Sequence, residues 1–552
     1  MTIESWKIVE QNKQAARDAL IPEDWRLSPK VLAESTTNVT HVPRTCGILT
    51  EAEIAITETP ADQLVARLAS GQLKSYDVTR AFCKRSAIAQ QLTNCLTEIM
   101  YEQALTKAQE LDEHLASGGK PLGPLHGLPV SFKDNFIIEG VDTTVGFTAW
   151  ANQPAAAHEE SAMTRIMRES GAIIYCKTNV PTAMMMAETY NNVWGYTTNP
   201  YNRQASSGGS SGGESALLAM NGSPIGIGTD IGGSIRIPAS FCGLYSLKPS
   251  FGRFATYGAR SGMPGQEAVR SINGPMSPTL EGLEVWTRAV LASSPWLRDP
   301  NMLPMPFREE TLPEKLCFGL ITDNRLVKPT PPVQRALAET RTALEAAGHS
   351  VVEWVVPETD TAARMIKTLF EADGGEKIAK TIAAGQEPWP KGMAAYATAF
   401  EKTREAGSAP GVGDYWAIQA ERTAYAKRAL DAWLATAELS GSGRPFDGVI
   451  SPVTPWPACP RDCFGGHVAY TAMWNVLDQP AATFPVTTVD PAVDLKTESP
   501  SRTPEEEFIW NNYDAEQLAG LPVGLQVVAP RLHEEKALAL TRVIRDALRG
   551  AA

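Results

Sequence analysis

The sequence has few cysteines, no excess of basic residues and no long apolar run, and each absence excludes a class of protein. Eight cysteines are scattered over 552 residues, too sparse for a disulfide scaffold, so we expect reduced thiols. Lysine and arginine number 50 against 62 acidic residues, and the formal charge of -12 argues against nucleic acid as a partner. No stretch approaches the roughly 20 apolar residues of a membrane span. The first 20 residues are charged and amphipathic and lack the apolar segment of a secretory signal, so we expect a cytoplasmic protein.

The remaining composition is that of a globular protein, and strand-like and helical patterns alternate along most of the chain. The hydrophobic content of 43% is enough for a large core. Length alone suggests roughly three or four domains, although single large α/β domains also occur. Strands are expected at the apolar segments 128–132, 172–178, 224–228, 315–323, 350–356 and 446–455, and at the C-terminal LPVGLQVV. Since helical patterns separate them, we predict one large α/β domain, a mixed twisted sheet flanked by helices.

Two segments lie outside this alternation. Residues 1–60 mix helical patches with several prolines, and we interpret them as an N-terminal arm packed on a domain that covers 61–552. Residues 360–440 are helical, with breaks at PWPKG and SAPGVG, and form an insertion suited to shape or cover a pocket.

The chain is organised around residues 206–239, SSGGSSGGESALLAMNGSPIGIGTDIGGSIRIPA. Ser210 and Ser234 each follow a pair of glycines, which allow unusual backbone angles and close approach of a ligand. A short helix is expected at 215–220, so Ser210 enters a helix from a loop. Ser234 lies on a glycine loop after the strand predicted at 224–228, and loops at strand ends are where α/β proteins place their sites. Two serines in such positions indicate nucleophile chemistry.

Two other interpretations of these glycines fit less well. GGSSG matches the G-x-S-x-G nucleophile elbow, but the preceding NPYNRQAS is polar and not strand-like. His349, His467 and His533 lie downstream, and none has a neighbourhood that marks it as catalytic. A phosphate cradle of the Walker type requires Gly-Lys-Ser/Thr after the loop, which does not occur. A nucleotide-binding module is therefore the weaker alternative to an enzyme.

Two further groups of residues have both a structural and a functional interpretation. Cys459, Cys463 and His467 have spacings that suit a metal, but no fourth ligand is close by and prolines flank them, so we favour a structural role and expect no metal site. Lys133 follows the strand predicted at 128–132. From its sequence context alone we expect this lysine side chain to reach water. In a dry pocket it would instead lose its proton and act as a base; lowering its pKa from about 10.4 to near 7.5 takes about 4 kcal/mol.

GGSSGGESALLA (208–219), six intervening residues and GIGTDIGGSIRIPA (226–239) resemble the defining motif of the amidase signature family. The resemblance extends upstream through GPLHGLPVSFKD (123–134) and on through KTNVP, NNVWGYTTNP, SPVTP and GLPVGLQVV, covering the chain from about residue 60. The run CKRSAIAQQLTNC, the length and the N-terminal arm look most like the fungal acetamidase-type branch. The motif is too long and specific to be a chance match.

The resemblance implies a Ser-Ser-Lys triad. Ser234 would be the nucleophile that forms an acyl-enzyme, Ser210 the bridging serine and Lys133 the base. The family's spacing of 24 positions between the two serines is kept, and the resemblance implies a cis peptide bond at Gly209-Ser210. Its further implications are an oxyanion hole from the N–H groups of Ile231, Gly232, Gly233 and Ser234, a supporting pair of Asp230 and Arg236, and substrate contacts of Met184 and Ser210.

Hydrophobic and aromatic residues near Met184 have two interpretations. Met184, Met185 and Met186 are core residues by default, although Met184 aligns with an acyl-pocket position of the family. Trp194 and Tyr196 suit a pocket or core packing equally.

The activity implied is hydrolysis of a small-molecule carboxylic amide to an acid and ammonia or an amine, without metal or cofactor. An amidotransferase A-type subunit that hydrolyses glutamine and a fatty-acid amide or carbamate hydrolase are the alternatives. The preferred substrate size and the oligomeric state, a homodimer included, stay open.

Overall fold

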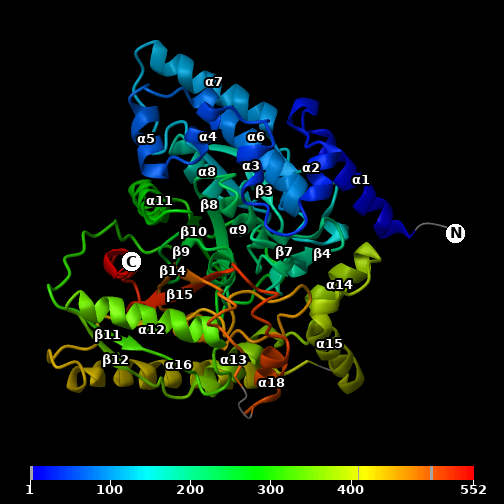
Figure 1. Cartoon of the computed structure of the whole chain (residues 1–552). Coiled ribbons are helices and arrows are strands. Elements are labelled where there is room, and N and C mark those ends of the chain that lie inside the picture. Colours follow the sequence, from blue (N-terminus) through cyan, green and yellow to red (C-terminus); the bar gives the residue numbers. More distant parts are fainter. Residues whose placement is uncertain (1–3, 408, 498–500, 552) are drawn as a thin grey trace.

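A mixed sheet of eleven strands runs through the whole molecule (Figure 1). The computed structural model describes residues 4–407, 409–497 and 501–551. Across the sheet the strands follow the order β1-β3-β2-β8-β10-β9-β14-β15-β13-β11-β12. Their bounds are β1 Leu96–Ile99, β2 Pro129–Lys133, β3 Ile173–Thr178, β8 Gly226–Asp230, β9 Tyr245–Lys248, β10 Ile272–Ser277, β11 Cys317–Leu320, β12 Ser350–Glu353, β13 Gly448–Pro452, β14 Ala481–Thr488 and β15 Pro522–Val528. Every segment predicted to be a strand overlaps one, whereas β1, β9, β10 and β14 lie in segments for which no strand was predicted.

Helices cover the sheet, which is why its central strands have no solvent-facing residues. All residues of β2, β3 and β8 are buried, as expected for strands covered on both faces. The α-helices of the main body are α5 Ala61–Ala69, α6 Ser75–Thr93, α7 Tyr101–Ala116, α8 Ala162–Glu169, α9 Gly212–Ala219, α10 Arg236–Phe241, α11 Leu280–Ala292, α12 Pro331–Ala346, α17 Ala469–Val476, α18 Pro504–Asn511 and α19 Glu534–Ala551. In Figure 1, α6 and α7 lie near the β1–β3 end of the sheet and α12 near the β11–β12 end.

The N-terminal arm is helical and shares the main hydrophobic core. Its helices are α1 Ser5–Ala19, α2 Pro29–Glu34, α3 Val42–Thr45 and α4 Glu51–Thr57. Ile21, Trp25 and Leu27 are buried in the same cluster as the sheet strands. A boundary near residue 60 stays a prediction.

The segment 360–440 is helical, as predicted. It contains α13 Thr359–Phe370, α14 Glu376–Gly385, α15 Ala394–Ala406 and α16 Val412–Ala435. The longest of these, α16, contributes Tyr425 and Trp433 to a second hydrophobic cluster beneath the sheet end. Among the described residues, no helix is both long enough and apolar enough to cross a membrane.

One local prediction is wrong. The polar segment before Ser210 does form a strand, β7 (Asn202–Ser206), paired with β6 (Thr198–Asn199) in a hairpin outside the main sheet. Its polar residues suit an element that leaves one face partly exposed. A second small hairpin joins β4 (Tyr190–Asn191) to β5 (Gly195–Tyr196).

The register of β2 and β8 creates the site. The two strands are parallel, with Ser131 opposite Gly226 and Phe132 opposite Ile227. Their carboxyl ends therefore meet at the same edge, and side chains that follow β2 lie beside those at the end of β8.

Candidate active site

Lys133, the last residue of β2, is completely buried and points at Ser210. Its Nζ lies 2.7 Å from Ser210 Oγ and 2.6 Å from Thr229 Oγ1. Burial lowers the pKa of Lys133 to about 7, although the Asp230 carboxylate and, where it is ionised, that of Glu214 act in the opposite direction. A lysine that reaches water is thereby excluded, and a large neutral fraction exists near neutral pH.

Ser210 is held in a tightly packed turn before α9. The peptide bond Gly209-Ser210 is cis, as the resemblance implied. A Cβ on Gly208 would lie 2.6 Å from Pro238, and one on Gly209 would lie 2.8 Å from the backbone of Ala187. Only glycine fits at these two positions, because such contacts involve backbone atoms that cannot yield.

Ser234 lies on the loop between β8 and α10 and is the one triad candidate that borders a cavity. The backbone N–H of Ser211 donates to the Ser234 carbonyl at 3.2 Å, which joins the two serine loops. The resemblance implied that Lys133, Ser210 and Ser234 lie together. The fold places Lys133 against Ser210 and joins the loops of the two serines through this backbone hydrogen bond.

Asp230 and Arg236 form a buried ion pair beneath the Ser234 loop. Arg236 contacts both carboxylate oxygens, at 3.0 and 3.1 Å. The same carboxylate accepts from the N–H groups of Gly233 at 2.8 Å and Ile235 at 3.1 Å. Burial alone would raise the pKa of Asp230, but Arg236 and Asn475 hold it well below its usual range. The pair is thus bonded directly to the backbone of the loop, and its supporting role stays a prediction.

The four predicted oxyanion-hole donors differ in availability. The Gly233 N–H is already donated to Asp230. Within the described residues, the N–H groups of Ile231, Gly232 and Ser234 have no hydrogen-bond acceptor. Unpartnered backbone donors beside a cavity are suited to an oxyanion. Three of the four are therefore free for this role.

Glu214, on the first turn of α9, is a buried carboxyl that sequence reasoning missed. Its Oε2 accepts from Ser131 Oγ at 2.6 Å, two residues before Lys133 on the same strand. Burial raises the pKa of Glu214 to about 8, so it is mainly protonated near neutral pH. Glu214 could have been noticed as an acidic residue inside the glycine-serine motif. A helix packed on a buried strand seldom has a charged residue on its buried face.

The cavity in front of Ser234 has a volume of about 770 Å³. Met184, Met185, Met186 and Tyr196 line it and are half-buried. The three methionines are therefore not the fully buried core residues expected by default, and Tyr196 takes the pocket position of its two interpretations. Ala183 and Met184 have φ values of 59° and 60°, uncommon for residues other than glycine, at the turn that carries these methionines. Trp194 is core: its Nε1 donates to Thr144 Oγ1 at 3.0 Å and it does not border the cavity.

The helical insertion closes this cavity from the other side. α13 contributes Ala363, Ile366, Lys367 and Phe370, which share one helix face, and the start of α15 contributes Tyr396. The expectation that 360–440 shapes a pocket is confirmed. α13 has one apolar face, which packs in the second hydrophobic cluster. The sequence could not show which residues of this helix border the cavity, because periodicity separates buried from exposed positions but does not separate core from pocket.

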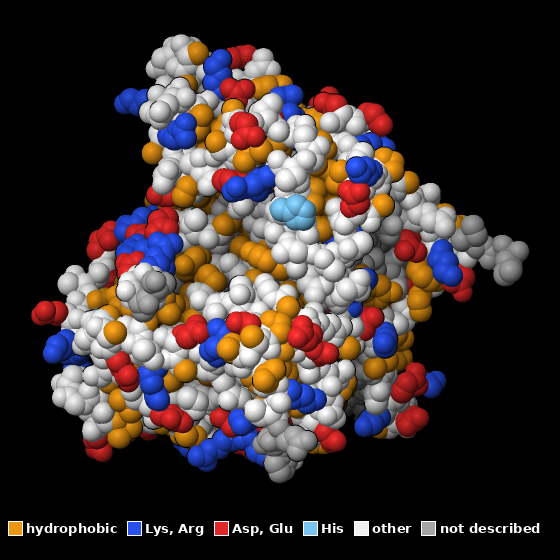
Figure 2. Space-filling model, in the orientation of Figure 1, with side chains coloured by type: hydrophobic (Ala, Val, Ile, Leu, Met, Phe, Trp, Pro, Cys, Tyr) orange, Lys and Arg blue, Asp and Glu red, His pale blue; other side chains and the backbone are white. Residues whose placement is uncertain are grey.

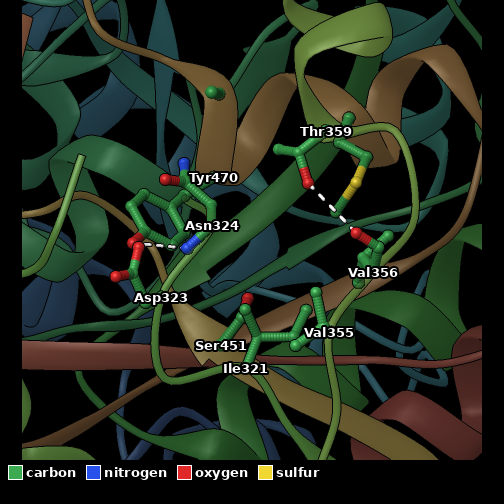
Figure 3. Close-up of a pocket in the computed structure, with 10 residues that line it drawn as sticks. Ile321, Asp323, Asn324, Val355, Val356, Thr359, Ser451 and Tyr470 are labelled. Atoms are coloured by element: carbon green, nitrogen blue, oxygen red, sulfur yellow. Dashed lines mark hydrogen bonds between the residues drawn. The ribbon is translucent and has the colours of Figure 1, made fainter. Parts of the chain in front are cut away.

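A second void near the site is far smaller. It has a volume of about 10 Å³ and lies between β11, α13 and α17, beside Asn324, Thr359 and Tyr470 (Figure 3). The Tyr470 hydroxyl accepts from the Asn324 N–H at 3.1 Å there. This volume is about the minimum that admits one water molecule and cannot hold a substrate.

Among the described residues, none of the histidine and cysteine candidates forms a hydrogen bond with Lys133, Ser210 or Ser234. The hydrogen-bond partner of Ser210 is Lys133, which does not fit a histidine-activated nucleophile elbow. His467 borders the cavity, where burial lowers its pKa to about 4, and its Nε2 lies 3.4 Å from Asn324 Nδ2. Cys459 is buried and Cys463 half-buried, and both are free thiols.

Comparison with known proteins gives matches along nearly the whole chain. The sequence model of the family described as Amidase matches residues 77–538. The acetamidase of Emericella nidulans is 38% identical over 550 residues, and that of Aspergillus oryzae 36% over 549, each covering 98% of both chains. A solved structure described as a fatty acid amide hydrolase superposes with a TM-score of 0.90 at 31% identity, covering 99% of this chain and 94% of that one.

Proposed function

Because this chain belongs to the amidase signature family, and is thus a hydrolase of amide C–N bonds, we propose that it works through an acyl-enzyme on Ser234. Ser210 and Lys133 relay the proton. The observation that carries the proposal is the 2.7 Å contact between Lys133 Nζ and Ser210 Oγ, with only Ser234 opening on the cavity.

In the proposed first step, neutral Lys133 takes the Ser210 proton while Ser210 takes that of Ser234. Ser234 Oγ attacks the amide carbonyl carbon, and the carbonyl oxygen becomes an oxyanion. The N–H groups of Ile231, Gly232 and Ser234 stabilise it; removal of one such donor typically costs about 3 kcal/mol in rate.

The tetrahedral intermediate then breaks its C–N bond. The proton returns from Lys133 through Ser210 to the leaving nitrogen, since an amide anion is a very poor leaving group. Water attacks the resulting ester by the same relay and releases the carboxylic acid. A pKa of about 7 suits Lys133 to both halves, because it can accept and return a proton near neutral pH.

Intact-mass measurement after treatment with phenylmethylsulfonyl fluoride tests the proposal. We expect one adduct per wild-type chain and none on Ser234→Ala. Ser210→Ala retains the nucleophile but lacks the bridge, so its labelling should be much slower. An adduct of equal extent on Ser234→Ala would refute the assignment. Ammonia release by the purified chain alone would count against an amidotransferase, which requires partner subunits.

A further inference from the structure

The cavity in front of Ser234 is much larger than a small amide needs. Its volume of about 770 Å³ lies within the range of about 300–1,000 Å³ of pockets that bury drug-sized ligands. Acetamide would fill only a small part of it, and the unfilled volume would hold water beside apolar walls.

The walls nearest Ser234 are apolar and come from two sides. A Cβ on Gly232 would lie 3.6 Å from the Phe370 ring and 3.9 Å from Ile366 Cδ1, so α13 faces the nucleophile loop directly. On the other side, Met184 and Met186 line the cavity. Flexible thioether side chains adapt to apolar groups of different shape.

Most charged side chains of the cavity are exposed and therefore belong to its outer rim. Arg364, Lys367, Lys391, Asp462 and Glu505 border the cavity and are all exposed. Glu188 and Glu371 are half-buried, and the Glu188 carboxylate accepts hydrogen bonds from the Tyr196 hydroxyl and the Phe464 N–H, so its charge is held by the protein. On the face shown in Figure 2, acidic and basic side chains are spread over the outer surface. Hydrophobic side chains are exposed in a central hollow. The deep part of the cavity thus suits an uncharged group.

The position of Ser210 decides which part of the substrate is large. In the proposed relay the leaving nitrogen must reach Ser210, which is 1% exposed and does not border the cavity. The nitrogen therefore lies at the closed end, where Gly209 packs on the backbone of residues 186–188. The other substituent of the carbonyl carbon has the open cavity before it.

We propose that the substrates are primary amides of bulky apolar carboxylic acids, with the acyl group between Phe370, Ile366 and the methionines 184–186. This rests on the proposed function and names the substrate class of the same site. Ammonia is the leaving group, and the acyl group extends toward the charged rim without carrying a charge itself.

Ammonia release from acetamide, butyramide, hexanamide and 3-phenylpropionamide tests this substrate class, and aniline release from hexananilide tests the effect of a bulky leaving group. We expect kcat/KM to rise about fourfold per methylene from acetamide to hexanamide, the factor that burial of one CH₂ provides. Hexananilide should be hydrolysed at least tenfold less efficiently than hexanamide. A flat or falling series, or a preference for the anilide, would overturn the proposal.

Two variants on α13 locate the acyl group. Phe370→Ala should lower kcat/KM for hexanamide at least fivefold more than for acetamide. Thr368→Ala lies on the same helix, is exposed and does not border the cavity, so its selectivity should equal that of the wild type. Equal losses on both amides in Phe370→Ala would contradict the placement.

Labelling of Ser234 by phenylmethylsulfonyl fluoride distinguishes a wrong substrate class from a wrong proposed function. If no amide of the series is hydrolysed but Ser234 is still labelled, the substrate class is wrong and the activated serine stands. If neither hydrolysis nor labelling occurs, the proposed function fails as well.

Discussion

Burial of Lys133 should make the wild-type chain less stable near neutral pH than a variant without the amine. The pKa of Lys133 falls from 10.5 to about 7 on folding, and at 1.36 kcal/mol per pKa unit this difference amounts to about 5 kcal/mol. The pKa of Lys133 is lower in the folded chain than in the unfolded chain. The wild type therefore loses this amount of its free energy of unfolding as the pH falls from 10.5 toward 7, and the loss is complete below 7.

Lys133→Met removes the titrating group and keeps an unbranched side chain of similar length. The variant loses the contacts with Ser210 Oγ and Thr229 Oγ1, each worth about 1 kcal/mol, and leaves two buried hydroxyls less well satisfied. At pH 6 the variant avoids the cost of about 5 kcal/mol of burying the amine. This gain in the free energy of unfolding exceeds the lost contacts by about 2–3 kcal/mol. At pH 9 only about 2 kcal/mol of the gain remains, so the two chains should be about equally stable.

Thermal unfolding at several pH values measures this difference. With an unfolding entropy of about 2.1 cal/mol/K per residue, a chain of 552 residues changes Tm by roughly 1 °C per kcal/mol. We expect Lys133→Met to melt about 2–3 °C above wild type at pH 6, to match it at pH 9, and to be inactive. In the wild type, kcat/KM should fall below an apparent pKa of about 7, because only the neutral amine accepts the Ser210 proton.

A second buried lysine provides the matched control. Lys177 is also completely buried, but its Nζ lies 3.4 Å from the Asp134 carboxylate. Lys177→Met leaves that carboxylate unpaired, which typically costs about 3–5 kcal/mol, so this variant should melt below wild type at both pH values. A Lys133→Met variant less stable than wild type at pH 6, or a difference that does not change with pH, would refute the reasoning.

The remaining predictions concern the Ser234 loop. Asp230→Asn removes the negative partner of Arg236 and should lower the free energy of unfolding by about 3–5 kcal/mol, measured as a fall in Tm of about 3–4 °C; an unchanged Tm would contradict the supporting role of the pair. Gly232→Ala and Gly233→Ala should differ sharply. A Cβ fits at Gly232, whereas Gly233 has φ +136° and its Cβ would lie 2.4 Å from Thr471 Oγ1, so only the second variant should lose more than about 2 kcal/mol in denaturant unfolding.

The sequence predicted the sheet well where periodicity and burial agree. Apolar runs such as 128–132 and 172–178 become β2 and β3 with boundaries shifted by one residue. Polar strands were not predictable in this way: the hairpin strand at 202–206 pairs outside the main sheet, where no apolar face is required. The strand expected at 315–323 is limited to Cys317–Leu320, the residues that are in register with β12 and β13.

At the site, spacing within the motif placed two serines, but nothing in it placed Lys133 beside them. That contact depends on the parallel register of β2 with β8, which brings residues 133 and 229 to one sheet edge. Thr229 and Phe370 were missed for a related reason. A threonine in a strand and a phenylalanine in a helix are common core residues, and only the folded chain shows that one contacts Lys133 and the other faces the nucleophile loop.

The ion pair beneath the loop also bears on the protonation of Lys133. A carboxylate near a lysine favours the ammonium form, and Asp230 does raise the pKa of Lys133. Because Arg236 contacts both oxygens of Asp230 in a fully buried pair, the positive charge of Arg236 opposes the effect of that carboxylate on its surroundings. Burial then outweighs the carboxylate, and the amine titrates near pH 7. Asp230 can thus fix the backbone of Gly233 and Ile235 through its negative charge without keeping the proposed base protonated.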